Sequence, residues 1–190
     1  MKMHYFLLIT GGNLEKQMHP YQELDMGLED RKKDKRAIFI DETLELKDKY
    51  KKYKKGNQSF KNFCFEWNES TNGEKRSQWG RYDNPNSKWD YWDISNNKWW
   101  MLPLKSGKVV SKAFKREIDF RKLNSSYAIL HRGQWIDQDE LCPLDKYGNP
   151  DILNKKRDFK KEKKLWKKIW REKIKEIDPN TLITAVDYHC

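Results

Sequence analysis

Apolar residues alternate with polar ones near both ends of the chain, and this pattern predicts β-strands. The first strand is expected over residues 3–10, where a short apolar run stops at two glycines. The last strand is expected over residues 181–189, whose apolar and β-branched residues predict a central position in the sheet. Asp187 and His189 lie two residues apart in that strand, so their side chains point to the same face.

A spacing of three or four residues between apolar positions predicts the helices. The longest is expected over 158–177, where an apolar stripe runs through a lysine-rich segment. That stripe consists of Phe159, Trp166, Trp170, Ile174 and Ile177. Two more helices are expected over 43–55, after an acidic start, and over 59–67, where Ser59 is a suitable N-cap. A short helix is expected over 111–122.

Residues 79–100 form an aromatic-rich stretch that holds five of the nine tryptophans. An Asn-Pro turn at 84–85 precedes a predicted strand over 88–94, and a second turn leads to a partner strand over 98–102. We expect the two strands to form a β-hairpin. Its indole faces would suit a stacked base and its lysines a phosphate, although tryptophans in a hairpin more often pack in a core.

At 190 residues the chain has the length of one domain, 1–190. Aromatic residues make up 14% of it and bury large areas, which indicates a folded protein. We expect an α+β fold with a mainly antiparallel sheet, a ferredoxin-like core and the Lys-rich helix just before the last strand. No apolar run approaches the length of a membrane span, and no complete signal peptide is visible. Three unevenly spaced cysteines without a CxxC motif favour the reducing cytoplasm over a disulfide framework or a structural zinc site.

The formal net charge of +11 is concentrated in one segment. Residues 155–176 carry twelve Lys or Arg residues and only four acidic ones. One interpretation is a solvated amphipathic helix that covers a sheet. The other is a helix that contacts the phosphates of a nucleic acid.

Candidate ligand-binding residues combine aromatic rings with charged and polar groups. They are Arg81, Asn84, Lys88, Trp89, Asp90, Trp92, Lys98, Trp99, Tyr21, Glu23, Asp187 and His189. The rings would stack a base and the cations would pair with phosphates. Asp187 with His189, or His19 with Glu23, would serve an enzyme as a metal-binding or proton-transferring pair; the alternative for each pair is a structural hydrogen bond. The spacing of these residues is not diagnostic, and the sequence predicts no cofactor and no metal site.

The run from Asn84 to Ile94, followed by Lys98-Trp99, resembles a family of small, mostly uncharacterised phage proteins with the pattern N-P-x-x-K-W-D-W-x-x-I-G-G-R-W. Residues 20–23, 127–135 and 183–190 resemble further stretches of the same family in the same order. The resemblance implies a phage origin and a compact α+β domain, but no established chemistry. This chain lacks the two glycines and the Arg of the family pattern and has an insertion of one residue there.

Our first hypothesis is a phage accessory protein in the cytoplasm of the infected host cell. It would sequester a small phosphate-bearing ligand such as a host immune signalling nucleotide, and thereby act against a host defence. One alternative is an inhibitor of a host nuclease complex, or a nucleic-acid binder, that acts through residues 155–176. Another is a metal-dependent phosphodiesterase-like enzyme, which we expect less than a binding protein. We expect no membrane partner, and the sequence predicts no oligomeric state.

Overall fold

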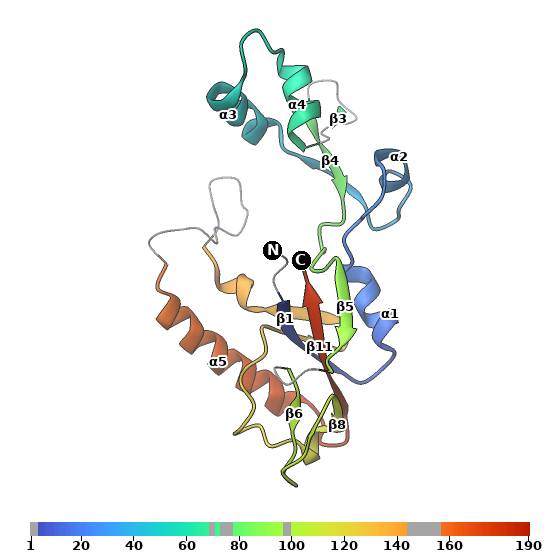
Figure 1. The fold of residues 1–190 in the computed structure, drawn as a ribbon, viewed down its shortest axis with the longest axis vertical. Coiled ribbons are helices and arrows are strands. Elements are labelled where there is room, and N and C mark those ends of the chain that lie inside the picture. Colours follow the sequence, from blue (N-terminus) through green and yellow to red (C-terminus); the bar gives the residue numbers. More distant parts are fainter. Residues whose placement is uncertain (1–3, 69–70, 73–77, 97–99, 144–156) are drawn as a thin grey trace. The chain divides into compact units, whose positions relative to one another are not determined.

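The structure is a computed structural model that describes residues 4–68, 71–72, 78–96, 100–143 and 157–190. The chain forms two compact units, where a single domain over 1–190 was expected. The larger unit contains residues 1–19 and 89–190, and the smaller unit contains residues 20–88. Helices and mainly antiparallel strands occur together, so the predicted α+β class is confirmed (Figure 1).

The sheet of the larger unit has the strand order β10-β9-β1-β11-β5, and β8 also pairs with β11. These strands are β1 (His4–Thr10), β5 (Tyr91–Ile94), β8 (Lys112–Phe114), β9 (Ala128–His131), β10 (Gln134–Asp137) and β11 (Leu182–His189). The predicted first and last strands are β1 and β11, although Met3 lies outside the described residues. The two strands pair antiparallel from Thr10 opposite Ile183 to His4 opposite His189, which gives β11 its predicted central place.

The parallel pair in this sheet is formed by β1 and β9, which are direct neighbours. A ferredoxin-like core is a split βαβ arrangement, in which another strand separates such a pair. The observed strand order therefore differs from the ferredoxin-like order that we expected. The antiparallel partners on either side are β10, which pairs with β9, and β11, which pairs with β1.

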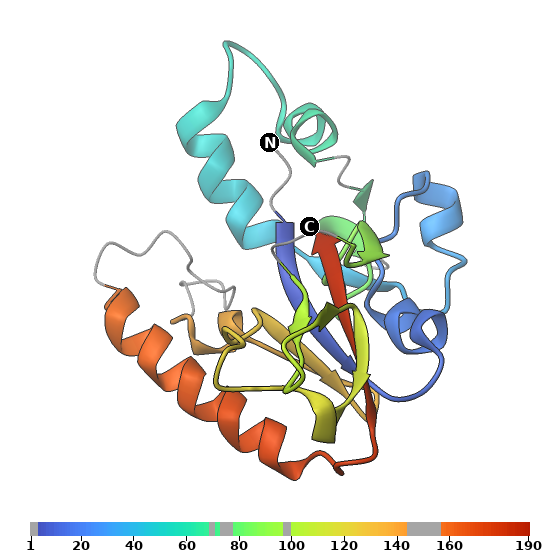
Figure 2. The same cartoon turned by 60° about the horizontal axis from the view of Figure 1, so that its bottom comes forward.

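Helix α5 (Phe159–Glu176) is the predicted Lys-rich helix and directly precedes β11. Its buried Trp166, Trp170 and Ile174 pack in a core with side chains from the sheet. The indole N–H groups of the two tryptophans donate to the backbone oxygen (2.7 Å) and the hydroxyl oxygen (2.8 Å) of Ser126. Figures 1 and 2 show α5 on one side of the sheet and the short helix α1 (Leu14–Met18) on the other.

Both ends of α5 are capped by side chains. Asp158 accepts a hydrogen bond from the backbone N–H of Lys161 at 3.0 Å, and its negative charge suits the N-terminus of a helix. At the other end the ammonium group of Lys115 donates to the backbone oxygens of Lys175 and Ile177. A cation at this position satisfies carbonyl groups that have no partner within the helix.

Two predicted elements are wrong. Residues 88–94 contain a strand, β5, but it pairs with β11, whereas β6 (Leu102–Pro103) pairs with β7 (Val109–Val110). Residues 98 and 99 of the expected hairpin lie outside the described residues, and of the described part of its second strand Leu102 pairs with Val110 and not with β5. The helix expected over 111–122 is replaced by β8 and the short 3-10 helix η2 (Lys115–Glu117), because hydrogen bonds to β11 override the helical spacing.

The smaller unit is built around a sheet with the order β2-β4-β3. Its elements are α2 (Leu28–Arg31), β2 (Ile38–Asp41), α3 (Thr43–Tyr53), α4 (Phe60–Asn68), β3 (Thr71–Asn72) and β4 (Trp79–Asp83). Leu46, Cys64 and Trp79 form its core, with Phe60 packed against them. Helices α3 and α4 confirm the two helices expected over 43–55 and 59–67, and the Ser59 hydroxyl accepts from the N–H of Asn62 as expected of an N-cap.

The remaining described elements are η1 (His19–Tyr21), where the two units meet in sequence, and η3 (Gln138–Leu141) after β10. None of the three cysteines, all of which the structure describes, forms a disulfide; Cys64 and Cys142 are buried and Cys190 is exposed. In the part of the chain that the structure describes, no helix is long and apolar enough to cross a bilayer.

Gly80→Ala is expected to destabilise the smaller unit. A Cβ at Gly80 on β4 would collide with the backbone oxygen of Ile40 on β2, and backbone cannot move aside as a flexible side chain can. We expect a loss of about 1–3 kcal/mol in the free energy of unfolding, the usual cost of overpacking, measured by urea denaturation. Gly27→Ala is the matched control, because a Cβ there meets no atom within 4 Å. Equal stability of the two variants would contradict the proposed packing.

Candidate metal centre

The sheet face that packs against α5 is apolar along most of its length and becomes polar at one end. On β11 the core residues Ile183 and Ala185 are followed on this face by Asp187 and His189. On β1 the same alternation ends at His4, which lies directly opposite His189 in the register. Two strands from opposite ends of the sequence thus bring three polar side chains together where the core ends.

The three side chains converge closely. The His4 Nδ1 atom lies 2.9 Å from Asp187 Oδ2 and 3.0 Å from His189 Nε2. One potential ligand atom from each residue lies within 4.8 Å of the other two. In a tetrahedral Zn²⁺ site with bonds of 2.0–2.1 Å, the ligand atoms are about 3.3 Å apart, so the observed spacing is close to that of a metal site. The His4 side chain is 57% exposed, which leaves one side of the cluster open to solvent.

The bonding around His4 Nδ1 is difficult to satisfy without a cation. An imidazole nitrogen carries either one hydrogen or one lone pair in the plane of the ring. If Nδ1 donates to Asp187, the same hydrogen must be shared with His189 Nε2; if Nδ1 accepts from His189, its lone pair faces a carboxylate oxygen. A metal ion among the three atoms would receive a lone pair from each of them, which removes this conflict.

Two further atoms of the cluster are buried without a hydrogen-bond partner among the described residues. They are Asp187 Oδ1 and His189 Nδ1. A buried polar atom without a partner costs about 1–3 kcal/mol. A cation bound by the cluster would stabilise the buried oxygen of Asp187, because that oxygen would then coordinate the cation or face its positive charge.

The neighbouring strand β5 adds a second carboxylate. Asp93 pairs with Asp187 in the register, and Tyr91 pairs with His189 with their ring centroids 5.2 Å apart. Like charges directly opposite each other on adjacent strands are destabilising. Asp93 is exposed and lies outside the convergent trio, and its Oδ1 accepts a hydrogen bond from the backbone N–H of Ile94 at 2.7 Å.

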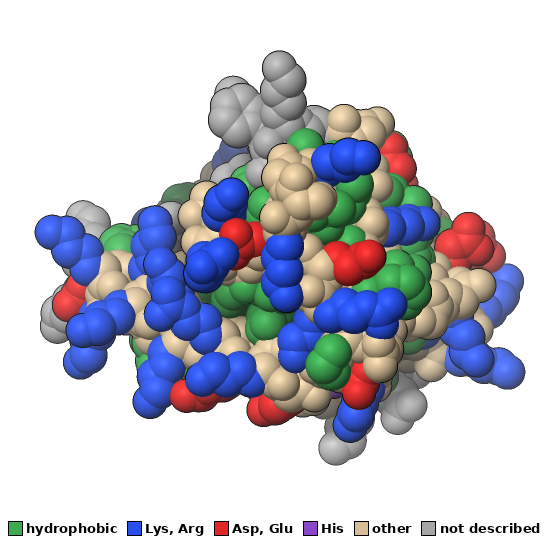
Figure 3. All heavy atoms as spheres, turned by 90° about the horizontal axis from the view of Figure 1, so that it is seen from below, with side chains coloured by type: hydrophobic (Ala, Val, Ile, Leu, Met, Phe, Trp, Pro, Cys, Tyr) green, Lys and Arg blue, Asp and Glu red, His purple; other side chains and the backbone are tan. Residues whose placement is uncertain are grey.

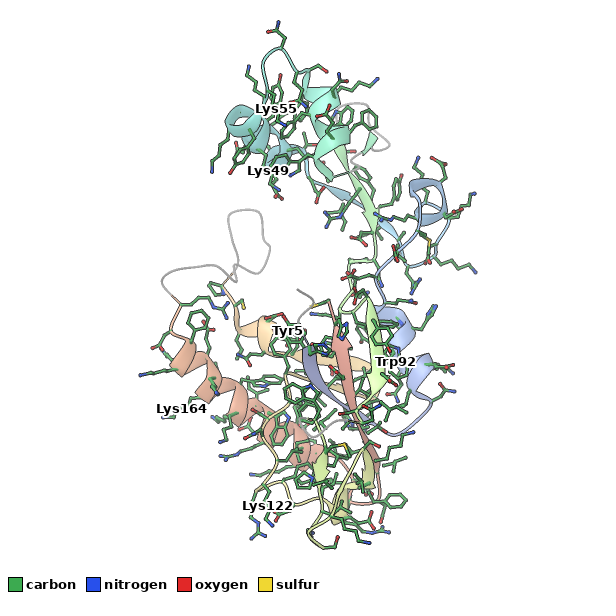
Figure 4. The ribbon with its side chains drawn as sticks, in the orientation of Figure 1. Tyr5, Lys49, Lys55, Trp92, Lys122 and Lys164 are labelled. Carbon is green, nitrogen blue, oxygen red and sulfur yellow. The ribbon has the colours of Figure 1, made fainter. Side chains whose placement is uncertain are left out.

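A cavity of about 310 Å³ is lined by Phe6 and by residues 100, 101, 103, 109 and 122–124, and the trio of His4, Asp187 and His189 is not part of its lining. One of its walls is Phe6, the register partner of Asp187 and a member of the same face of β1 as His4. The ring of Phe6 stacks on that of Trp100, with centroids 5.4 Å apart and an angle of 15° between the rings. The side chain of Lys122 also lines the cavity (labelled in Figure 4, where Tyr5 marks the strand position next to His4).

Of the residues singled out from the sequence, the structure brings Asp187 and His189 together but adds His4, which sequence reasoning missed. The prediction of no metal site did not anticipate this trio. The signal that could have found it is the His at the start of the first predicted strand. To use this signal one would have to know that the first strand pairs antiparallel with the last one. The local sequence of a strand does not show which other strand it pairs with.

Trp89 and Trp92 occupy packing positions. Trp89 is buried and its indole N–H donates to the backbone oxygen of Met18 at 3.0 Å. Trp92 packs edge-on against Trp89 and lies on the α1 side of β5 (Figure 4), opposite to the face that carries His189. Lys98 and Trp99 lie outside the described residues, and the backbone N–H of Asp90 donates to the backbone oxygen of His189.

The candidates Tyr21, Glu23, Arg81, Asn84 and Lys88 belong to the smaller unit. Arg81 pairs with Glu42 at 2.9 Å and with Asp83 at 3.1 Å. The buried Asn84 amide donates to the backbone oxygens of Pro20 (2.8 Å) and Gln22 (3.0 Å). The backbone N–H of Lys88 donates to the backbone oxygen of Tyr21 (2.7 Å). These contacts give Arg81 and Asn84 structural roles, whereas the centre of His4 and Asp187 lies in the larger unit.

Trp89→Phe is expected to lower stability by about 1 kcal/mol through loss of the hydrogen bond to Met18, and to leave metal binding unchanged. Thermal denaturation and a metal titration of the same sample measure the two effects. A Trp89→Phe protein of unchanged stability that no longer binds metal or phosphate would contradict the packing role.

The outer side of α5 is strongly basic. Its exposed cations include Lys160, Lys161, Lys164, Lys168, Arg171 and Lys175. Figure 4 shows Lys164 on the side turned away from the sheet, and Figure 3 shows Lys and Arg side chains spread over one face with a few acidic ones between them. Lys155 and Lys156 of the predicted basic segment lie outside the described residues. Nucleic-acid binding through this segment stays a prediction.

Comparisons with known proteins give this chain no family. No family model matches it, and neither the curated proteins nor the solved structures contain a match. The resemblance to phage proteins therefore stays a prediction.

Proposed function

We propose that the protein binds a small phosphate-bearing ligand through a divalent metal ion held by His4, Asp187 and His189. The observation that carries this proposal is the position of His4 Nδ1, within 3.0 Å of both a carboxylate oxygen and a second imidazole nitrogen. The phage accessory role, the sequestration of a host signalling nucleotide and the location in the host cytoplasm are predictions that accompany this proposal.

The ligand set favours a transition metal. Two imidazoles and one carboxylate suit Zn²⁺, Fe²⁺ or Co²⁺ better than Mg²⁺ or Ca²⁺, which prefer oxygen ligands only. Three protein ligands leave at least one coordination position for another group. The exposure of His4 places that position toward solvent, where a ligand can enter.

The charge of the protein favours an anionic ligand. Phosphate oxygens coordinate metal ions, and the formal net charge of +11 attracts anions from a distance. The carboxylates of Asp187 and Asp93 would repel a phosphate from this end of the sheet if no metal were bound. Binding of phosphate is therefore expected to require the metal.

Calorimetric titration with ribose 5-phosphate tests the proposal. The metal-free protein and the protein loaded with Co²⁺ are compared, and mass spectrometry of the released ligand shows whether it stays intact. We expect binding only to the loaded protein and recovery of the intact ligand. Equal binding with and without the metal would overturn the proposal. Release of inorganic phosphate would overturn sequestration and favour a metal-dependent hydrolase of phosphate monoesters, in which an ion held by His4, Asp187 and His189 would supply an activated water.

A further inference from the structure

A second cavity, of about 390 Å³, lies at the other end of β1 from the proposed metal centre. Its lining includes Thr10, the last residue of that strand, whereas His4 of the metal centre is the first. Six residue steps along an extended strand span about 20 Å, so the two sites are separate. The volume of the cavity is within the range of small-molecule sites.

The lining of this cavity is polar and contains one cation and one anion. Arg132, from the turn between β9 and β10, supplies the positive charge, and Asp178, from the segment between α5 and β11, supplies the negative one. Both residues are exposed, and no ion pair joins them in the part of the chain that the structure describes. The other side chains of the described lining are those of Thr10, Gln17, His131 and Thr181, all of which form hydrogen bonds. Two opposite charges that do not pair with each other suit a ligand that carries both.

Arg132 has a backbone conformation that arginine rarely adopts. With Gly133 it forms the two-residue turn of the β9–β10 hairpin, and the φ angles of the two residues are 53° and 77°. A turn with two positive φ angles is of type I′, in which Asn-Gly is the favoured sequence. Among the described residues other than glycine, Arg132 is alone in having a positive φ. Because such strain is concentrated at ligand-binding sites, and the turn itself favours Asn, the arginine side chain has a role that the turn does not explain.

Hydrogen bonds hold other side chains of the lining in place. Thr10 Oγ1 lies 2.6 Å from His131 Nδ1, and the amide of Gln17 donates to the backbone oxygen of Gly11. Burial lowers the pKa of His131, and the charge of Arg132 lowers it further, so the imidazole is neutral at pH 7. A neutral imidazole has one donor and one acceptor, and its Nε2 atom therefore takes the role opposite to that of Nδ1. Side chains that are fixed before binding reduce the entropy that is lost when a ligand binds.

From these observations we infer that this cavity binds a free polar α-amino acid, with the carboxylate of the ligand on Arg132 and its ammonium group on Asp178. The planar guanidinium group matches a carboxylate in a bidentate arrangement, and a carboxylate accepts hydrogen bonds from an ammonium group. The hydroxyl, amide and imidazole groups of the lining would bond a polar side chain of the ligand. Such binding needs no metal ion and is independent of the proposed function.

Calorimetric titration of the metal-free protein with L-serine, L-asparagine and L-glutamine tests the inference. We expect at least one of them to bind with one molecule per chain. The N-acetyl derivative of that amino acid lacks the ammonium group, and its α-amide lacks the carboxylate. Each derivative should bind at least about tenfold more weakly, because each loses a charge-assisted hydrogen bond. Absence of saturable binding by all three amino acids, or equal binding of either derivative, would overturn the inference while leaving the proposed function intact.

Arg132→Asn separates binding from folding. Asparagine suits the turn better than arginine does, so the melting temperature of the variant should stay equal or rise, while its affinity for the amino acid falls at least about tenfold. A merely structural role of Arg132 would not produce these opposite effects. Its binding of Co²⁺ should be unchanged, because the metal centre lies at the other end of β1.

Asp178→Asn and Arg171→Gln complete the test. The Asp178 Oδ1 atom accepts from the backbone N–H of Asn180 at 2.7 Å, and an amide oxygen can keep this bond, so the first variant removes little except the charge. It should also bind the amino acid at least about tenfold more weakly. Arg171 is an exposed arginine outside the lining, and its substitution should leave the affinity unchanged. Unchanged affinity in Arg132→Asn or Asp178→Asn, or an equal loss in Arg171→Gln, would exclude this cavity as the binding site.

Discussion

Asp187→Asn is expected to lower the affinity for Co²⁺ or Zn²⁺ by more than about 100-fold, because it removes the one anionic ligand of the proposed centre. Loss of an outer hydrogen-bond partner of a metal ligand already costs about 10–100-fold. The variant keeps the size and shape of the side chain but not its charge. Calorimetric titration of metal into the metal-free proteins measures the difference.

The same substitution should act in the opposite direction on the metal-free protein. Without a cation, the Asp187 carboxylate has a buried oxygen without a partner and lies opposite Asp93. An uncharged amide removes the repulsion, so thermal stability without metal should stay equal or rise. With metal at 100 times its dissociation constant, the unmodified protein should gain about 2.7 kcal/mol and the variant much less.

His19→Ala and Asp93→Asn are the matched controls for this prediction. His19 is an exposed histidine outside the cluster, and Asp93 is a carboxylate next to it that does not belong to the convergent trio. Both should bind metal nearly as tightly as the unmodified protein. A similar loss in Asp93→Asn and Asp187→Asn would place the ion between the two strands and contradict the assignment of the ligands.

Trp166→Ala is expected to have the largest effect on folding. Trp166 is 2% exposed, belongs to the core between α5 and the sheet, and donates its indole hydrogen to the backbone oxygen of Ser126. Removal of a buried tryptophan costs about 3–5 kcal/mol, and the Ser126 oxygen would lose a buried partner as well. Urea denaturation measures this loss as a lower midpoint.

Phe159→Ala is the control for Trp166→Ala, because Phe159 lies on the same helix and is 61% exposed. Its substitution should change the free energy of unfolding by less than about 0.5 kcal/mol. If both substitutions had the same small effect, α5 would not be anchored on the sheet by its tryptophan face. This test is independent of the metal centre.

Periodicity in the sequence predicted those elements that have one buried face. Strands β1 and β11 and helix α5 were found because their apolar residues follow the period of one buried face. The partner of β5 was not predictable in the same way. Its aromatic residues fit any sheet, and the free edge of β11 rather than the adjacent turn determined the pairing.

The candidate site was predicted only in part for the same reason. The alternation within β11 was sufficient to place Asp187 and His189 on one face. The third residue, His4, comes from a strand 183 positions away from Asp187, and only the register of the folded sheet brings the two together. Trp89 has the aromatic ring expected of a surface that stacks a ligand, but its indole N–H donates to the backbone oxygen of Met18. Only the tertiary structure reveals this contact.

Titration of Co²⁺ into the metal-free protein tests the central claim most directly, because tetrahedral Co²⁺ bound to nitrogen and oxygen ligands absorbs visible light much more strongly than the hydrated ion. We predict one Co²⁺ per chain, an intense visible spectrum, and its disappearance when Zn²⁺ is added or when His189 is replaced by Ala. A protein that is folded by circular dichroism but gives only the spectrum of hydrated Co²⁺ would contradict the account, and His4, Asp187 and His189 would then form a structural hydrogen-bonded cluster.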